Sequence, residues 1–374
     1  AHSTHPTPTD GPIEVMISVP AGASSAQRFA TLSAFNAAGF KVLGLLNEPS
    51  AAGIEYAHRY RKTFTAARQE VVVYDLGGGT FDASRVRMSA GAHKVMAHAG
   101  LGDLGGADVD ALLLRLAIDE SGHDVVVDAA LLERVREAKE CITPNTRKVL
   151  VELDDDHAVS VKVDDLYEAC APLLARSLAA LEPLVASEAD LAGIYVVGGG
   201  SELPLVARTL RERFGRKVKR SAYASASIAV GLALAADGQA PQLEETLARA
   251  FGVFREGDSG KQIIFDPILA PEHPLNGAPI IRRYRAVHNV GHLRYVECDA
   301  VHNGAPDGDV TPFAEMRVAY DPALVGQELA GIEVVPLVQG PIIEERYSIQ
   351  KHGSVAVTIT NLDTDVQLAQ LEPR

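Results

Sequence analysis

Apolar and polar positions alternate in blocks along residues 14–236, with the periods expected of strands and helices. Residues 14–60 predict strand, helix, strand, helix, and the helix near the end of this stretch is rich in alanine. The next block, at 71–100, predicts strands. Residues 107–186 predict mainly helices with one strand pair. Residues 193–236 predict a strand, a glycine loop, a helix, a short strand and a final helix. Alternation of this kind predicts a layered α/β architecture.

Polar side chains and glycine mark the ends of the predicted helices. Ser24 and Gln27 fit a capping box at the start of the first helix, and Gly39 fits its end. Glu48, followed by proline, fits the first turn of the second helix, where a carboxylate is favoured by the helix dipole. Asp164 fits the N-cap of a later helix.

Beyond about residue 240 the helical period gives way to short alternating stretches. Met316, Val318 and Tyr320 fall on one face of an extended chain, which is the period-two pattern of a half-buried strand. Strands are expected at 263–265, 280–284, 293–296, 316–320, 332–335 and 355–359, with a hairpin across 346–360 that turns at 351–353. Prolines between these stretches are typical of the loops of a β-sandwich.

The composition of the chain narrows the classes of protein to consider. A chain of 374 residues with 47% apolar residues can bury the cores of two or three domains. Its net charge of −14 argues against a nucleic-acid partner, and no apolar run approaches the length of a membrane span. Three scattered cysteines suit a reducing cytoplasm. His288 and His292 have no third metal ligand nearby in sequence, so we expect a surface or hydrogen-bonded structural role for them rather than a metal site.

The strongest chemical signal is the segment 71–82, an apolar run that leads into Asp75-Leu76-Gly77-Gly78-Gly79-Thr80-Phe81-Asp82. Three glycines allow the backbone to approach a phosphate and to direct N–H groups at it. The two aspartates could hold a hydrated Mg²⁺ or orient a water molecule. A tight hairpin without a ligand is the alternative, and we favour a nucleotide phosphate site.

Five segments, in order, resemble the 70-kDa heat-shock chaperone family of the actin-like ATPase superfamily. The second phosphate loop of that family is present without a change at 75–82. The other matching segments lie at 18–28, 47–52, 104–110 and 197–204. The family resemblance implies actin-like (ribonuclease-H-like) ATPase lobes followed by a C-terminal β-sandwich, hence an α/β plus all-β fold.

The resemblance implies a site for ATP or ADP with Mg²⁺. Its phosphate-binding positions here are Gly77, Gly78, Gly79 and Thr80. Asp75 would be the catalytic carboxylate that orients water or the metal shell. Asp82 and Glu48 would complete that shell through metal-bound waters, because Mg²⁺ dehydrates reluctantly.

The remaining implied contacts are with the rest of the nucleotide. Gly106 would approach it across the cleft, and Gly198 with Gly199 would form the floor on the base side. Lys139 and Thr143, spaced by one helical turn, would touch adenosine, although a lysine by itself is more often a solvated surface residue.

Four positions depart from the family pattern near the base, so the resemblance implies phosphate binding more strongly than adenine selectivity. The family has an acidic residue one helical turn before the lysine, and this chain has Arg136 there. The family has an arginine directly after the lysine, and this chain has Glu140. An arginine of the adenosine motif is replaced by Glu202, and a later aspartate by Ser225.

The first phosphate loop of the family and its catalytic lysine have no counterpart before residue 14, and no helical lid follows the β region. We therefore expect an N-terminally truncated, lidless member, most simply a fragment. The expected parts are a flexible lead-in at 1–13, a remnant of the first ATPase lobe at 14–62, a second lobe with a helical outer subdomain at 70–238, and a substrate-binding-like β-sandwich at 247–374.

Two classes of function are left open. The first is a cytoplasmic stress-response chaperone that couples ATP binding and hydrolysis to the binding of unfolded or extended peptide segments, with co-chaperones as further partners. Half of the phosphate clamp is missing, so we expect this form to be inactive as an ATPase. The second is a non-catalytic binding or scaffolding protein whose nucleotide lobe is structural.

Overall fold

The computed structural model describes residues 11–88, 93–122, 125–154, 156–185, 190–238, 247, 249–257, 262–271, 273–275, 277–350 and 353–371. Residues 1–10 of the predicted lead-in, and two residues of the predicted turn at 351–353, lie outside these ranges. The chain forms two compact units. One, the α/β unit, is Asn47–Leu243; the other, the β-rich unit, combines Ala1–Leu46 with Glu244–Arg374. The segment 14–62 is thus divided between the two units.

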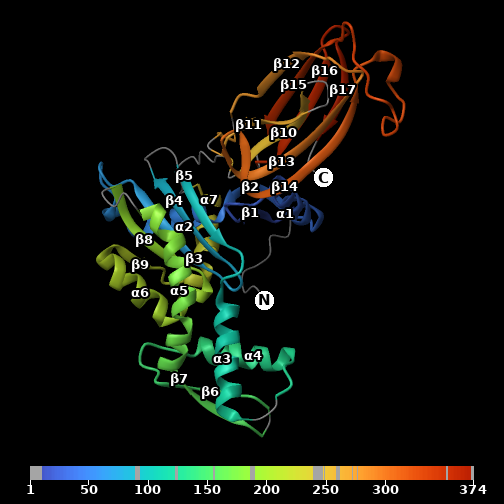
Figure 1. Ribbon diagram of the computed structural model, residues 1–374. Coiled ribbons are helices and arrows are strands. Elements are labelled where there is room, and N and C mark those ends of the chain that lie inside the picture. Colours follow the sequence, from blue (N-terminus) through green and yellow to red (C-terminus); the bar gives the residue numbers. More distant parts are fainter. Residues whose placement is uncertain are drawn as a thin grey trace. The chain divides into compact units, whose positions relative to one another are not determined.

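The α/β unit is built on a five-stranded sheet of order β5-β4-β3-β8-β9 (Figure 1). Its strands are β3 (Glu70–Leu76), β4 (Phe81–Met88), β5 (His93–Leu101), β8 (Leu191–Val197) and β9 (Val218–Arg220). β3, β4 and β5 pair antiparallel, while β8 runs parallel to β3 and β9 runs parallel to β8.

Both faces of this sheet are covered, which explains the continuous apolar run of β3. Val71 and Val73 pack on one face with α2 (Glu48–Arg59). Val72 and Tyr74 pack on the other face with α5 (Val163–Val185) and α6 (Pro204–Phe214). Strands buried on both faces read as unbroken apolar sequence rather than as an alternation.

Helix α2 also packs against α7 (Ser227–Ala236) at a backbone-to-backbone contact. A Cβ atom placed on Gly231 of α7 would lie 1.9 Å from the carbonyl oxygen of Ala51 in α2. The two helices can approach this closely only because residue 231 has no side chain.

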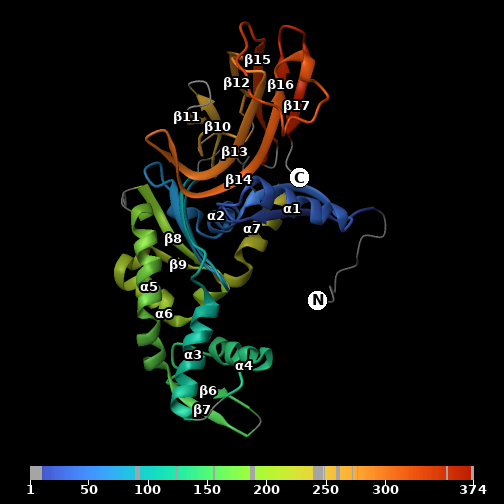
Figure 2. The same cartoon turned by 45° about the vertical axis from the view of Figure 1, so that its right-hand side comes forward.

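A smaller part of the α/β unit extends from the sheet (Figure 2). It consists of α3 (Gly106–Ser121), α4 (Ala129–Glu140) and the hairpin of β6 (Lys148–Glu152) and β7 (Ala158–Lys162), together with the first turns of α5. Because α5 already begins at Val163, Asp164 lies in its first turn and is not the predicted N-cap.

The β-rich unit contains a sandwich of two four-stranded antiparallel sheets, of orders β11-β10-β13-β14 and β12-β15-β16-β17. The strands are β10 (Ala250–Gly257), β11 (Gln262–Leu269), β12 (Ile280–Arg285), β13 (Val290–His302), β14 (Ala305–Ala319), β15 (Ile342–Ile349), β16 (Val355–Asn361) and β17 (Val366–Leu371). Side chains of both sheets, among them Phe251, Tyr295 and Tyr347, form its core.

The N-terminal elements of the chain complete the β-rich unit. β1 (Glu14–Val19) pairs with β2 (Lys41–Asn47), and α1 (Ser25–Ala37) packs on them through Leu32 and Phe35. The predicted capping box of Ser24 and Gln27 is present. The backbone N–H of Ser25 donates to a carboxylate oxygen of Glu297 in β13 at 3.0 Å, and both residues are buried.

The predicted α/β plus all-β fold is confirmed, with local corrections. Residues 332–335 form no strand; the only pairing near them is an isolated bridge between His288 and Pro336. The sequence patterns did not predict β10 or β17. Prolines also occur inside strands: Pro312 lies in β14 where its pairing with β13 shifts register.

Candidate functional site

The glycine loop is a four-residue hairpin connection that closes β3 onto β4. Leu76 pairs with Phe81, and the N–H of Gly77 donates to the carbonyl of Thr80 at 2.9 Å. Asp75 and Asp82 are partners in the same ladder, so the two carboxylates are held on neighbouring strands at the base of the loop. The hairpin and the carboxylate pair are therefore one structure.

Three carboxylates of this site influence one another. Burial, together with Glu48 and Asp82, raises the pKa of Asp75 to about 7. Burial and Asp82 raise the pKa of Glu48, which begins α2. Burial also raises the pKa of Asp82, although His98 and the Thr80 hydroxyl act in the opposite direction. The site thus concentrates negative charge in partly buried positions, where a cation would relieve the repulsion.

Glycines from three separate segments meet at the loop. The N–H of Gly106, at the start of α3, donates to the carbonyl of Gly77 at 2.9 Å. The N–H of Ala107 donates to the carbonyl of Gly78 at 2.7 Å. A Cβ atom on Gly105 would lie 2.6 Å from the same Gly78 oxygen. The N-terminus of α3 is in this way attached directly to the glycine loop.

The third segment is the turn after β8. Gly198 has a φ of +84°, and a Cβ atom there would lie 2.2 Å from Oδ1 of Asp75. A Cβ atom on Gly200 would lie 2.7 Å from the carbonyl of Gly77. Gly199 faces Ser225, whose Cβ is 3.9 Å from the corresponding position. Gly105 and Gly200 were not among the predicted site residues, although both belong to the glycine runs that signalled the site.

Gly78 and Gly79 differ from these packed glycines. A Cβ atom on either would meet nothing within 4 Å, and neither has a positive φ. Packing and backbone conformation therefore give no reason for glycine at the tip of the loop. Thr80, the last residue of the loop, is exposed beside them.

The structure brings Lys139 to the site but does not show this for Thr143. The Lys139 ammonium lies 3.2 Å from the carbonyl oxygen of Gly106 and 2.7 Å from Oδ1 of Asp110, and its side chain is 12% exposed. Lys139 is therefore not a solvated surface residue. Helix α4 ends at Glu140, so the expected helical spacing to Thr143 is wrong; Thr143 is exposed and bonds Thr146 at 2.9 Å.

Of the residues that depart from the family pattern, two lie on the exposed side of α4. Arg136 pairs with Glu133 at 2.7 Å and lies 3.8 Å from Glu140. Glu202 is exposed at the end of the turn that follows β8. Ser225 lies close to Gly199, as described above.

Direct metal coordination by three side chains is not available at this site. Within the residues that the structure describes, no group of three or more His, Cys, Asp and Glu side chains could hold a metal ion. The mutual repulsion of Glu48, Asp75 and Asp82 nevertheless suits a cation that keeps its own water shell.

The helices that the structure describes include no candidate for a membrane-spanning segment, because none combines the necessary length with the necessary apolar character.

Comparison with known proteins gives one consistent result. A family model described as "Hsp70 protein" matches residues 11–247. Proteins named "Chaperone protein HscA homolog" from Burkholderia mallei (strain SAVP1), Burkholderia pseudomallei (strain 668) and Burkholderia thailandensis are each 35% identical over 240 residues. Each match covers 61% of this chain and 38% of the relative, so the chain spans well under half the length of the curated relatives it matches.

Proposed function

Because the chain belongs to the Hsp70 family, we propose that its α/β unit binds the phosphates of ATP or ADP with Mg²⁺ at the glycine loop. The observation that carries this proposal is the exposed glycine tip, where neither packing nor backbone conformation requires glycine at 78 and 79, above the paired Asp75 and Asp82. Backbone N–H groups at such a loop suit a phosphate.

The surrounding residues fit a nucleotide with its cation. Asp75, Asp82 and Glu48 would hold Mg²⁺ through its waters, and the bound ion would neutralise phosphate charge. Asp75, with its raised pKa, is the carboxylate suited to orient an attacking water. Lys139, held by Asp110 beside Gly106, would lie near the rest of the nucleotide, and Gly198 and Gly199 would leave room for it.

For the β-rich unit we propose the binding of extended peptide segments, as expected for a chaperone of this family. The support is its two-sheet sandwich, whose edge strands can pair with an extended chain. Coupling of peptide binding to ATP hydrolysis, co-chaperone partners, a cytoplasmic location and a part in stress response belong to the same proposal. The alternative of a structural nucleotide lobe predicts no nucleotide binding.

Calorimetric titration with Mg-ATP and Mg-ADP tests the proposal. We expect saturable binding that Gly78→Ala weakens by about tenfold or more, because the new methyl group occupies the phosphate space. Asp75→Asn should weaken the Mg²⁺-dependent part by roughly tenfold to a hundredfold. Release of inorganic phosphate, measured in the same samples, tests the expectation that this form binds nucleotide without hydrolysing it.

Gly331→Ala is the matched control, because residue 331 also has open space around its Cβ position but belongs to the β-rich unit. It should bind like the unchanged protein. Absence of binding, or equal affinity in all three variants, would contradict a phosphate site at this loop and favour the scaffolding alternative.

A further inference from the structure

The α/β unit has a surface on which basic residues far outnumber acidic ones. Residues 208–220 read Arg-Thr-Leu-Arg-Glu-Arg-Phe-Gly-Arg-Lys-Val-Lys-Arg, in which Glu212 is the acidic side chain. Residues 59–62 read Arg-Tyr-Arg-Lys. The whole chain has a net charge of −14, so its remaining residues are together more acidic than that figure. We call the surface formed by these two segments the basic edge.

The fold places the two segments at the same edge of the five-stranded sheet. Among the described residues β9 pairs only with β8, so it is an outermost strand, and α6 precedes it in the chain (Figure 1). The Tyr60 hydroxyl donates to the carbonyl of Arg220 in β9 at 3.4 Å. The Arg59 guanidinium lies over the ring of Tyr223, 5.0 Å from its centroid. Segment 59–62 therefore adjoins the end of β9.

Part of the positive charge is neutralised within the α/β unit. The ion pairs of the basic edge are Arg59 with Glu55 at 2.5 Å, Arg208 with Glu212 at 4.0 Å, and Arg213 with Glu182 at 3.2 Å. These contacts fix three of the arginines to their own helices or to α5, and they leave the strand itself without a carboxylate.

A larger part of the charge has no such partner. Within the part of the chain that the structure describes, no ion pair is made by Arg61, Lys62, Arg211, Arg216, Lys219 or Arg220. Nε of Arg220 is buried without a hydrogen-bond partner, which costs free energy. Like charges gathered at one edge also repel one another, and a bound carboxylate would relieve that repulsion.

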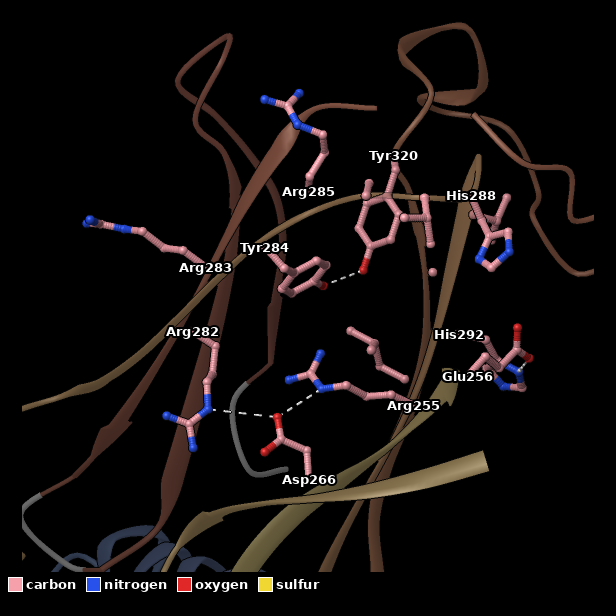
Figure 3. Close-up of a pocket in the computed structure, with 15 residues that line it drawn as sticks. Arg255, Glu256, Asp266, Arg282, Arg283, Tyr284, Arg285, His288, His292 and Tyr320 are labelled. Atoms are coloured by element: carbon pink, nitrogen blue, oxygen red, sulfur yellow. Dashed lines mark hydrogen bonds and ion pairs between the residues drawn. The ribbon is translucent and has the colours of Figure 1, made fainter. Parts of the chain in front are cut away.

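A group of arginines in the β-rich unit shows the opposite arrangement (Figure 3). They line a cavity of about 350 Å³, in which Arg255 pairs with Asp266 at 3.1 Å and Arg283 pairs with Glu344 at 2.7 Å. Carboxylates of the protein neutralise these side chains, so the cavity requires no anion from outside. The basic edge differs because its carboxylates would have to come from another molecule.

We propose that the basic edge binds an acidic segment of a partner protein, which lies extended along β9. Backbone groups on the free side of β9 would pair with this segment. Because β9 has only three residues, such pairing supplies few hydrogen bonds. Carboxylates of the segment would contact Arg216 and Lys219, and those beyond the end of the strand would contact Arg61 and Lys62. This surface is separate from the proposed nucleotide site and from the sandwich.

Two alternatives fit the surface less well. DNA, RNA or an anionic bilayer would extend past the basic edge and be repelled by the acidic remainder of the chain, whereas a short acidic segment contacts the edge alone. Charge on an edge strand can also serve simply to prevent pairing with other chains. That second explanation predicts no affinity for acidic peptides.

Peptide titration followed by fluorescence anisotropy tests the proposal on the full chain. The probes are labelled, amidated dodecapeptides in which serine alternates with glutamate or with isosteric glutamine. They lack apolar side chains, so the proposed peptide function of the sandwich does not obscure the result. We expect the glutamate peptide to bind roughly tenfold more tightly, and the difference to shrink as salt is added. Arg61→Gln and Lys219→Gln should each weaken it roughly twofold to fivefold, and together more strongly.

Arg115→Gln is the matched control, because Arg115 is an exposed arginine of the same unit but belongs to α3. It should leave the affinity for the glutamate peptide unchanged. Equal affinity for the two peptides, or equal effects of Arg115→Gln and Lys219→Gln, would overturn the proposal. Tighter binding of an oligothymidylate of equal charge would overturn it in favour of a nucleic-acid partner. Mg-ATP affinity of the same variants should not change, since the basic edge lies outside the proposed nucleotide site.

Discussion

Asp75 occupies a position where a carboxylate is difficult to ionise. It is half-buried at the end of a central strand, with Glu48 and Asp82 nearby, and its pKa is raised to about 7. The folded protein therefore retains a proton there over a pH range in which the unfolded chain releases it. Such a residue is kept at a cost in stability, which is common at functional sites.

This cost can be measured without any ligand. Between about pH 4 and pH 7 the stability contributed by protonated Asp75 is lost as pH rises, because the folded pKa lies above the unfolded value. Asp75→Asn cannot ionise, so with EDTA at about pH 8 it should be more stable than the unchanged protein by about 1–3 kcal/mol. Near pH 4 the two should agree in urea unfolding. A variant that is less stable at every pH would contradict the raised pKa.

Many residues of the candidate site could be selected from the sequence because they lie in short contiguous motifs. The loop at 75–82 contains its own carboxylates and glycines, and the turn at 198–200 has a similar signal. The pairing of Lys139 with Asp110, and the attachment of Gly106 to Gly77, depend on contacts between distant segments. No local pattern predicts such contacts. The sequence spacing of Lys139 and Thr143 predicted one helical turn between them, which is wrong because α4 ends at Glu140.

At the scale of elements, the N-terminus of α1 packs against the middle of β13. The Glu297 carboxylate accepts hydrogen bonds from the backbone N–H and the hydroxyl of Ser25, at the end of a helix where negative charge is favoured. Since both residues are buried, loss of the Ser25 hydroxyl or of the Glu297 carboxylate removes a hydrogen bond that water cannot readily replace.

A double-mutant cycle should detect this link. We expect Ser25→Ala and Glu297→Gln to destabilise the β-rich unit by about 1–3 kcal/mol each, with a coupling energy of about 1 kcal/mol or more, because both changes act on the same hydroxyl–carboxylate bond. Thr31→Ala, on the exposed side of α1, serves as the control. Additive effects of the two substitutions would mean that the contact contributes nothing to stability in solution.

Elements could be predicted where a local sequence pattern specifies them. The prediction failed where a strand forms only by pairing with a segment distant in sequence. The strand-helix alternation of residues 14–60 and the hairpin of β6 with β7 follow from period and capping alone. β10 was missed although it lies at the centre of its sheet, and its sequence shows no clean alternation. Residues 332–335 have the apolar character of a strand but find no neighbouring strand to pair with.

At the scale of the whole molecule, the chain forms two units with separate cores. Every predicted nucleotide contact lies in the α/β unit, and the sandwich for which we propose peptide binding lies in the β-rich unit. The β-rich unit is discontinuous, because residues 1–46 join it to residues 244–374. Ligands of the two units should therefore stabilise different parts of the chain.

Differential scanning calorimetry should resolve this. We expect two unfolding transitions, of which Mg-ATP raises the midpoint temperature of only one, that of the α/β unit. A ligand at about a hundred times its Kd adds about 2.7 kcal/mol to the unit it binds. Gly78→Ala should abolish only the shift caused by nucleotide. A single transition that moves as a whole with Mg-ATP would instead show that the two units unfold together.

The contact between Gly231 and Ala51 has a consequence for how sequence variation at this site should be interpreted. Gly231 contacts α2, the helix that begins at Glu48. A side chain at residue 231 would push α2 away and so displace the Glu48 carboxylate, although residue 231 does not touch it. The obstructing atoms at residue 51 are backbone, and no second change there could compensate. Related sequences that keep the three carboxylates should therefore keep glycine at 231 as well. We expect a homologue without this glycine to have lost the use of its nucleotide site even where every residue of the loop is retained.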